Sequence, residues 1–337
     1  MKTVILKRPG QFVWADTPEP ASPAATEVLI EIHRVGVCGT DLHAFGGNQP
    51  FFSYPRILGH ELGAVVLEAG PEVTNVRPGD HVAVEPYLTC GHCRACRAGR
   101  YNCCQTLQCL GVHTDGGMRE RMVVPADRLH RSDRLSLDQL ALVETLGIGA
   151  HAIQRASLEA DEWTAVVGVG PIGVGVLQMA LAQCARVIVI DLSEARLAFA
   201  AHLGATQTIN ATKHDVAAAL AELTDGDMPS CVFDATGSPR SMEKSAELAG
   251  QGGRIVYVGL AQARISFDDP SFHRKELTIL ASRNSNGLFP YLIRLIEEGE
   301  IDVNPWITHR LDLEDVPVGF PDLTRPEHGV LKALITV

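Results

Sequence analysis

The chain has 337 residues, enough for about two domains and a substantial buried core. Hydrophobic residues make up 46% of it, and no segment approaches the roughly 18 unbroken apolar residues of a membrane span. The formal net charge is −11 and there is no basic run, so neither nucleic acid nor a membrane is expected as a partner.

The chain begins with MKTVILKRPGQFVW, which alternates apolar and polar residues like a strand and lacks the apolar core of a secretion signal. Nine cysteines without such a signal argue against a disulfide framework. We therefore expect a soluble protein in the reducing cytoplasm.

The predicted elements change character along the chain. Residues 1–149 contain the β-type runs TVILKR, EVLIEIHRVGV, AVVLEAG and HVAVEPY, which predict a mainly β domain. In residues 150–284, apolar runs at 164–170, 186–191, 231–237, 254–260 and 277–282 alternate with helical stretches. One stretch, SEARLAFAAHLG, has Ser193 as N-cap and Gly204 as stop. This alternation predicts an α/β domain with a doubly wound parallel sheet.

Residues 285–337 form a third segment. It opens with a helix-like LFPYLIRLIEEG and ends with LKALITV, which resembles a strand that returns to the first domain.

A glycine-rich turn follows the first apolar run of the second domain. Gly168, Gly170 and Gly173 form GxGxxG between a strand and a helix. The glycines permit a tight turn, a close approach of pyrophosphate and tight packing of helix on strand. Asp191 closes the next strand, where a carboxylate binds both ribose hydroxyls of an adenosine and repels a 2′-phosphate. The turn therefore predicts NAD rather than NADP.

Four cysteines lie close together in the first domain. Cys90, Cys93, Cys96 and Cys104 have the spacing CxxCxxCx7C, and Cys103 is an alternative to Cys104. Four thiolates close one tetrahedral zinc without an open position, so the site is predicted to be structural. The remaining cysteines after this cluster, Cys109, Cys184 and Cys231, are expected to be small buried residues.

A second cluster of metal-binding residue types precedes this lobe. Cys38 begins CGTDLH, and His60 and Glu61 follow in GHE. A thiolate, an imidazole and an acid leave a zinc with room for water or substrate. On such a zinc an alcohol loses its proton near neutral pH, and hydride then passes to a nicotinamide.

Together these motifs resemble the medium-chain, zinc-containing alcohol and polyol dehydrogenase superfamily over essentially the whole chain. The matching pieces, in the family's order, are CGTDLH, GHE, the cysteine lobe, ALVETLGIGAHA, GVGPIG, Asp191 and DATG. The resemblance implies a GroES-like catalytic domain joined to a Rossmann domain. It also implies a homodimer or homotetramer, NAD, and two zinc ions per chain, one catalytic and one structural.

The resemblance also implies roles for single residues. Zinc is held by Cys38 and His60, with Glu144 as the third position, directly or through water, ranked above Glu61, which also enters the zinc shell. Thr40 accepts the substrate proton and His43 passes it to solvent. Asp41 orients His60. The expected dinucleotide contacts are Gly168, Gly170, Pro171, Ile172, Gly173, Asp191, Arg196, Thr236, Val258 and Arg283.

The substrate side of the resemblance favours sugar-acid members of the superfamily. Asn48, Arg283 and Asn284 supply hydrogen bonds for a hydroxylated acid, and Phe51 with Phe52 supplies an apolar wall. We therefore predict oxidation of a secondary hydroxyl of an L-galactonate-like acid to a ketone. Polyols and L-threonine are alternative substrates, and an inactive protein that binds zinc or a nucleotide is the alternative of another class.

Overall fold

A computed structural model describes residues 1–50 and 52–337 of the chain. Phe51, one of the predicted substrate contacts, lies outside the described residues. The chain forms two compact units: unit 1 comprises residues 1–144 and 289–337, and unit 2 comprises residues 145–288. Among the described residues, no helix has both the length and the apolar character needed to cross a bilayer.

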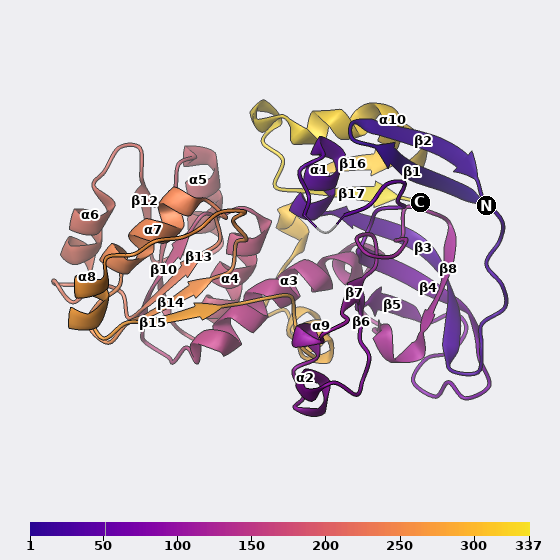
Figure 1. Cartoon of the computed structure of the whole chain (residues 1–337), viewed down its shortest axis with the longest axis horizontal. Helices are drawn as coiled ribbons and strands as arrows, with labels where there is room; N and C mark the ends of the chain where they lie inside the picture. Colours follow the sequence, from indigo (N-terminus) through magenta and orange to yellow (C-terminus); the bar gives the residue numbers. More distant parts are fainter. Residues whose placement is uncertain (51) are drawn as a thin grey trace. The chain divides into compact units, whose positions relative to one another are not determined.

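Unit 1 is mainly β (Figure 1). Its large sheet consists of β3 (Glu27–Val37), β4 (Glu61–Ala69), β5 (His81–Val84), β8 (Arg121–Pro125), β9 (Leu129–Arg131), β16 (Ile307–Asp312) and β17 (Lys332–Thr336). The strand order is β16-β17-β3-β4-β5-β9, and β8 also pairs with β3. Two small sheets are β1 (Lys2–Arg8) with β2 (Gln11–Asp16), and β6 (Tyr87–Leu88) with β7 (Gln108–Cys109). Because β17 pairs with β3, the predicted return of the C-terminal strand is confirmed.

Unit 1 also contains short helices. They are α1 (Gly39–Gly46), α2 (Arg94–Arg97), α9 (Phe289–Glu297) and α10 (Val316–Gly319), with 3₁₀ turns at Tyr101–Cys103, Ala126–Arg128, Asn304–Trp306, Leu313–Asp315, Phe320–Thr324 and Pro326–His328. A long helix, α3 (Leu137–Ala156), begins in unit 1 and ends in unit 2.

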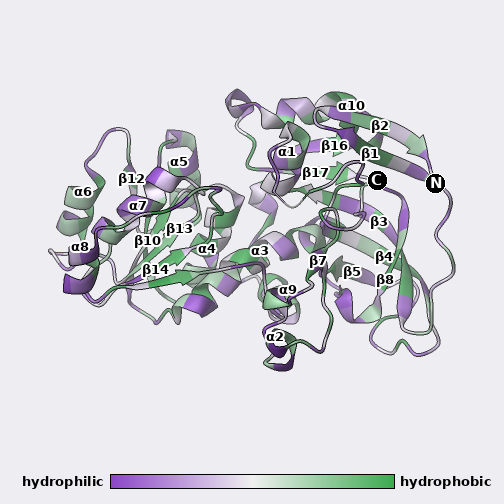
Figure 2. Ribbon diagram, in the orientation of Figure 1, coloured by the Kyte–Doolittle hydropathy of each residue, from purple (hydrophilic) through white to green (hydrophobic). Residues whose placement is uncertain are grey.

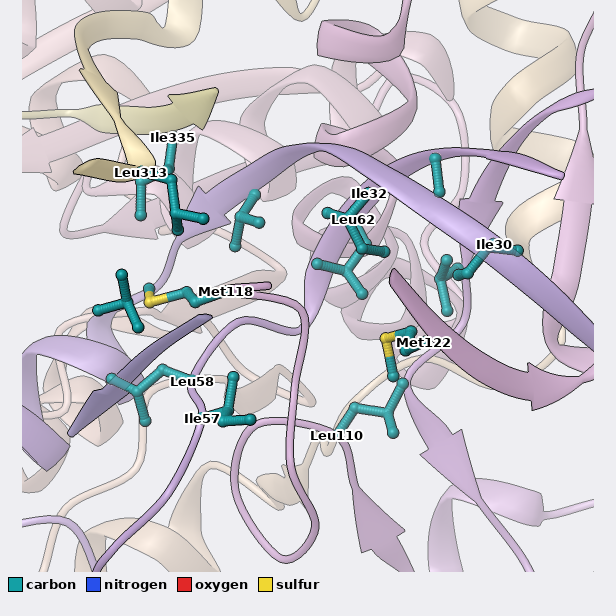
Figure 3. Packing of buried hydrophobic residues seen from close by; sticks show 14 of the residues in the cluster. Ile30, Ile32, Ile57, Leu58, Leu62, Leu110, Met118, Met122, Leu313 and Ile335 are labelled. Carbon is teal, nitrogen blue, oxygen red and sulfur yellow. The ribbon is translucent and has the colours of Figure 1, made fainter. Parts of the chain in front are cut away.

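The core of unit 1 combines residues of the large sheet with residues outside it, such as Leu58 and Met118 (Figure 3). Along β3, Val28, Ile30 and Ile32 are at most 1% exposed, whereas the residues between them are only partly buried. This alternation is the period of two that a sheet with one buried face requires.

Unit 2 is a six-stranded parallel sheet. Its strands are β10 (Trp163–Val167), β11 (Arg186–Asp191), β12 (Gln207–Asn210), β13 (Cys231–Asp234), β14 (Arg254–Tyr257) and β15 (Thr278–Ala281). Its further helices are α4 (Pro171–Ala182), α5 (Glu194–His202), α6 (Val216–Leu223), α7 (Pro239–Leu248) and α8 (Asp269–Arg274). Figure 2 shows β10, β13 and β14 as hydrophobic ribbons, as strands buried on both faces require.

The strand order of unit 2 is β12-β11-β10-β13-β14-β15, with every pair parallel. The chain starts at β10 and continues through β11 to β12 at one edge of the sheet. It then returns with β13 next to β10 and continues through β14 to β15 at the other edge. Right-handed crossovers then place the helices of the two halves on opposite faces, so the predicted doubly wound sheet is confirmed.

Local signals set several element boundaries. The Ser193 hydroxyl accepts the Arg196 N–H at 3.4 Å and caps α5, and Gly204 ends the helical segment at φ +102°. Strand β12, with the mixed sequence QTIN, was not predicted. The expectation that Cys184 is buried is wrong, because it occupies an exposed left-handed turn at φ +57° after α4.

Candidate active site

Strand pairing brings the first candidate metal ligands together in unit 1. Cys38 follows β3 and is the N-cap of α1, whereas Glu61 begins β4 directly after His60. Gly36 of β3 is paired with Glu61. The ligand atoms of Cys38, His60 and Glu61 all lie within 4.8 Å of one another.

The surroundings of His60 favour a positive charge. Asp41 is fully buried, its Oδ2 accepts the Cys38 N–H at 2.9 Å, and its Oδ1 lies 3.7 Å from Nδ1 of His60. Burial alone would lower the pKa of His60, but the charges of Asp41 and Cys38 outweigh burial and hold it well above its ordinary value. The donor set of a thiol, an imidazole and a carboxylate fits a divalent metal ion.

Glu61 has a partner that the sequence did not reveal. Nζ of Lys332 donates to its two carboxylate oxygens at 2.7 and 2.8 Å and to the Val37 carbonyl at 3.2 Å. The side chains of Lys332 and Glu61 are 1% and 0% exposed. Burial lowers the pKa of Lys332, but the charge of Glu61 outweighs it, so the pKa lies above its ordinary value and the ammonium stays charged.

Glu144, on α3, was predicted as the third zinc position. Its carboxylate is 5% exposed, and burial raises its pKa despite the opposing effect of His60. Oε1 accepts a short hydrogen bond from the hydroxyl of Tyr87, a residue that sequence reasoning missed. Glu144 is not in the group of ligand atoms within 4.8 Å, but it lies close enough to interact electrostatically with His60 and Glu61.

The peptide before His60 is held by close backbone packing. Gly59 has φ +96°, and a Cβ on Gly111 or Gly116 would lie 2.8 or 2.2 Å from its backbone atoms. The Gly117 N–H also donates to the Gly59 carbonyl at 2.9 Å. The GVHTDGGM segment therefore needs its glycines in order to fix the position of His60.

The predicted proton relay lies on α1. Thr40 is half-buried, and His43 is exposed one helical turn later, so both side chains lie on one face of the helix. The predicted substrate contact Asn48 is exposed, and its Oδ1 lies 3.2 Å from Nδ1 of His43. Phe52 packs edge-on against Tyr54, with ring centroids 4.8 Å apart.

The four-cysteine lobe has the geometry of a closed metal site. The sulfur separations are 3.5 Å for Cys93 and Cys96, 3.5 Å for Cys90 and Cys104, and 4.0 Å for Cys90 and Cys96. Zn–S bonds of about 2.3 Å place tetrahedral sulfurs roughly 3.8 Å apart. Backbone N–H donors from Cys96 and Gln105 lower the pKa of Cys93 to about 6, whereas burial raises the pKa of Cys96 to about 12. Cys103 is exposed and outside this group.

The glycine-rich turn joins β10 to α4 in unit 2. Gly168 has φ +84°, and a Cβ on Gly173 would lie 1.8 Å from the Gly168 carbonyl oxygen. By contrast, the nearest atom to a Cβ on Gly170 would be Nη1 of Arg196, at 3.8 Å. Pro171 and Ile172 open α4. Because Pro171 has no backbone N–H, the N–H donors of the first turn begin at Ile172. The turn is thus tightly packed on its protein side and open at Gly170.

The other predicted dinucleotide residues follow the carboxyl ends of neighbouring strands. Asp191 accepts the Val169 N–H at 2.8 Å and the Ser193 N–H at 2.9 Å. Thr236 donates to Asp234 at 2.6 Å. Val258 follows β14, and the exposed Arg283 and half-buried Asn284 follow β15.

Comparison with known proteins identifies the family. Residues 24–134 match the alcohol dehydrogenase GroES-like domain, and residues 171–298 match the zinc-binding dehydrogenase family. The chain is 40% identical over 311 residues to L-galactonate-5-dehydrogenase of Escherichia coli strain K12, with 92% of this chain and 91% of that protein covered. The chain belongs to the zinc-type alcohol dehydrogenase superfamily. The predicted family, fold class and enzyme class of this dehydrogenase are therefore confirmed.

Two further comparisons cover 89% and 100% of the dehydrogenase. L-Threonine 3-dehydrogenase of Bacillus velezensis is 34% identical, with 89% of this chain and 88% of that protein covered. The crystal structure of an alcohol dehydrogenase, rspB, from Escherichia coli CFT073 complexed with NADH has a TM-score of 0.93. It is 31% identical, with 100% of this chain and 99% of that chain covered.

Proposed function

We propose that this dehydrogenase oxidises a secondary hydroxyl of an L-galactonate-like sugar acid to a ketone and transfers hydride to NAD. The observation that carries the proposal is the group that the half-buried Cys38, the N-cap of α1, forms with the buried His60 and Glu61; α1 also bears Thr40 and the exposed His43. The 40% identity to L-galactonate-5-dehydrogenase supports the substrate class.

The metal centre requires three proposed ligands and an open position. Cys38, His60 and Glu144 would hold a zinc ion, directly or through water at Glu144, and the zinc supplies a Lewis acid that polarises the substrate hydroxyl. Asp41 faces Nδ1 of His60 and keeps the other ring nitrogen for the metal. Cys90, Cys93, Cys96 and Cys104 would hold the second zinc, which is structural.

The proton and the hydride of the substrate pass to different acceptors. The Thr40 hydroxyl accepts the hydroxyl proton, and His43 passes it to water at the surface. The carbon-bound hydrogen leaves with its electron pair, and bound NAD supplies the acceptor. One alcohol and one NAD thus become one ketone, one NADH and one proton.

Unit 2 is the proposed cofactor domain. The N–H groups after Pro171 and the side chain of Arg196 would hold the pyrophosphate, and Thr236, Val258 and Arg283 would supply further contacts at the carboxyl ends of the strands. Asp191 would accept the ribose hydroxyls. We expect a higher kcat/KM for NAD than for NADP, and Asp191→Ala should reduce the difference; a preference of the natural enzyme for NADP would contradict this assignment.

The substrate assignment is tested by NADH formation with L-galactonate, L-gulonate, L-idonate, sorbitol, 2,3-butanediol and L-threonine. The highest kcat/KM is expected for one of the three acids. Activity on a polyol or on threonine alone would overturn the substrate class but keep the reaction, whereas a chain with no activity on any of them and only one zinc would overturn the reaction. Light scattering tests the expected homodimer or homotetramer.

A further inference from the structure

Tyr87 has no role in the proposed reaction, yet it contacts one of the proposed zinc ligands. It is 3% exposed and lies on the short strand β6. Its hydroxyl donates to Oε1 of Glu144, which is 57 positions later on α3. A hydrogen bond from a buried hydroxyl to a buried carboxylate is stronger than a neutral one and is costly to break.

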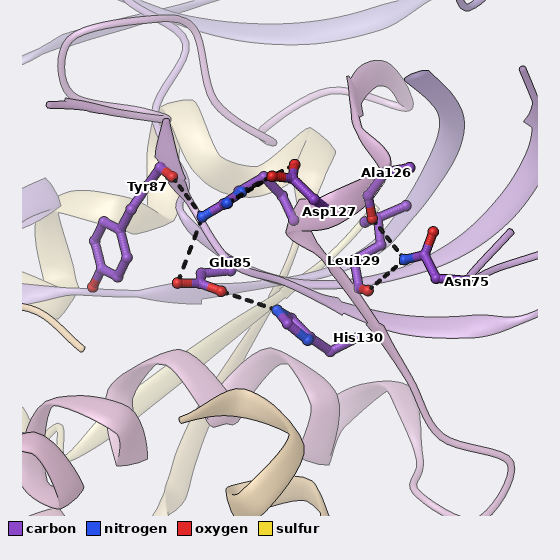
Figure 4. Close-up of polar contacts among 8 residues, drawn as sticks. Asn75, Glu85, Tyr87, Ala126, Asp127, Leu129 and His130 are labelled. Carbon is purple, nitrogen blue, oxygen red and sulfur yellow. Dashed lines mark hydrogen bonds and ion pairs between the residues drawn. The ribbon is translucent and has the colours of Figure 1, made fainter. Parts of the chain in front are cut away.

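The backbone of Tyr87 is fixed from two sides. Nη1 of Arg128 donates to the Tyr87 carbonyl at 3.2 Å, and Tyr87 is paired with Cys109 of β7. Arg128 is itself held by Asp127 at 2.7 Å and by Glu85 at 3.8 Å. Figure 4 shows the Tyr87 carbonyl directed toward this network. The phenol therefore extends toward Glu144 from an anchored strand rather than from a free loop.

Glu61 and Glu144 are held by donors of different kinds. The ammonium of Lys332 occupies both oxygens of Glu61, whereas the Tyr87 hydroxyl donates to Oε1 of Glu144. Glu144 interacts electrostatically with His60, and the charge of Glu61 opposes the charge of Glu144. Glu144 is therefore held by a neutral hydroxyl, whereas Glu61 is held by an ammonium.

We propose that Tyr87 is a positioning residue for the metal centre, whose hydroxyl fixes Oε1 of Glu144 so that Oε2 serves the zinc, directly or through water. The role rests on the proposed function, because it requires Glu144 at the catalytic zinc. Partners of metal ligands orient them in this way, and removing such a partner typically costs about 10- to 100-fold in metal affinity or activity.

The test replaces Tyr87 by Phe in the full-length zinc enzyme. Tyr87→Phe should lose the exchangeable zinc to a chelator about tenfold faster than the natural enzyme. It should also change the visible absorption of the enzyme with Co²⁺ at the catalytic site, and lower kcat more than it raises KM. The matched control is Tyr257→Phe, which removes a half-buried hydroxyl bonded to the Met242 carbonyl in unit 2 and should leave zinc exchange unchanged.

Zinc exchange and Co²⁺ absorption identical to those of the natural enzyme would overturn the role of Tyr87. In a Glu144→Ala background, Tyr87→Phe should have no additional effect, and an equally large additional effect would also overturn it. If Tyr87→Phe does not fold, Glu144→Ala removes the other partner of the hydrogen bond. Zinc retention equal to that of the natural enzyme in this variant then refutes the proposal. If the natural enzyme contains one zinc and forms no NADH, the proposed function is refuted as well. This result distinguishes a failure of the proposed function from a failure of the role of Tyr87 alone.

Discussion

The substitution Lys332→Met tests the buried ion pair that holds Glu61. Methionine resembles lysine in length and volume, so the change removes the charge without leaving a large cavity. The two side chains are 1% and 0% exposed, with N–O distances of 2.7 and 2.8 Å. Removing one partner of such a pair leaves an uncompensated buried charge and costs about 3–5 kcal/mol. That is a large part of a typical net stability of about 5–15 kcal/mol.

The assay is urea unfolding of the zinc-loaded enzyme, followed by tryptophan fluorescence, which includes the fully buried Trp306 of unit 1. Lys332→Met should lower the midpoint strongly, and adding Glu61→Gln should restore most of the loss because no unpaired charge remains. Lys2→Met is the control: Lys2 makes an exposed pair with Glu314 at 2.5 Å, and its loss should leave the midpoint unchanged. A cost below about 1.5 kcal/mol for Lys332→Met, as for an ordinary volume-conserving core substitution, would refute the reasoning.

Gly36→Ala probes the same pair without touching either charge. A Cβ on Gly36 would lie 2.0 Å from Oε2 and 2.8 Å from Cβ of Glu61, so the carboxylate would have to move away from Lys332. We expect a lower urea midpoint than for Gly39→Ala, where a Cβ would meet no atom within 4 Å. Equal midpoints for the two variants would show that Glu61 moves without cost.

The remaining predictions concern the cysteine lobe and an ion-pair cluster. Cys96→Ser should lower the zinc content by one ion per chain and expose the lobe to trypsin, whereas Cys103→Ser should keep both metals; metal analysis that gives the reverse would exclude the assigned ligand set. Asp138 accepts from Arg34 at 2.5 Å and Arg310 at 2.6 Å. Burial alone would raise the pKa of Asp138, but the two arginines outweigh it and lower the pKa below its ordinary value. A lowered folded-state pKa stabilises the fold above the unfolded pKa of about 3.9, and the stabilisation is lost as pH falls. The difference in urea midpoint between the natural enzyme and Asp138→Asn should therefore be constant above about pH 5 and shrink below pH 4; a difference that does not change with pH would contradict the ion-pair assignment.

The features that the sequence predicted well are those whose parts lie close together along the chain. The glycine-rich turn joins a strand to a helix in consecutive residues, and local steric contacts require glycine at Gly168 and Gly173. The cysteine lobe places its four sulfurs within 15 residues. The class of unit 2 followed from alternating apolar runs, although the mixed strand β12 carried too few apolar residues to be predicted.

The features that the sequence did not predict are contacts between distant positions. Lys332 and Glu61 are 271 positions apart, and Tyr87 and Glu144 are 57 apart. A lysine that begins the strand KALIT has the residue type and place of a solvent-exposed strand end. It is buried because β17 pairs with β3 and β3 pairs with β4, which is a property of the sheet order. The signal that the sequence offered for this burial was a lysine directly before the apolar residues of β17.

Lys332 also sets the charge that the proposed zinc centre presents. The acidic groups near His60 include the half-buried thiol of Cys38 and the buried carboxylates of Asp41, Glu61 and Glu144. Four unpaired anions in one place would repel one another strongly. The ammonium of Lys332 pairs with Glu61 within the protein and so lowers the negative charge that a zinc ion would face there. Lys332, on β17, thus serves the proposed metal centre by pairing with a carboxylate beside it.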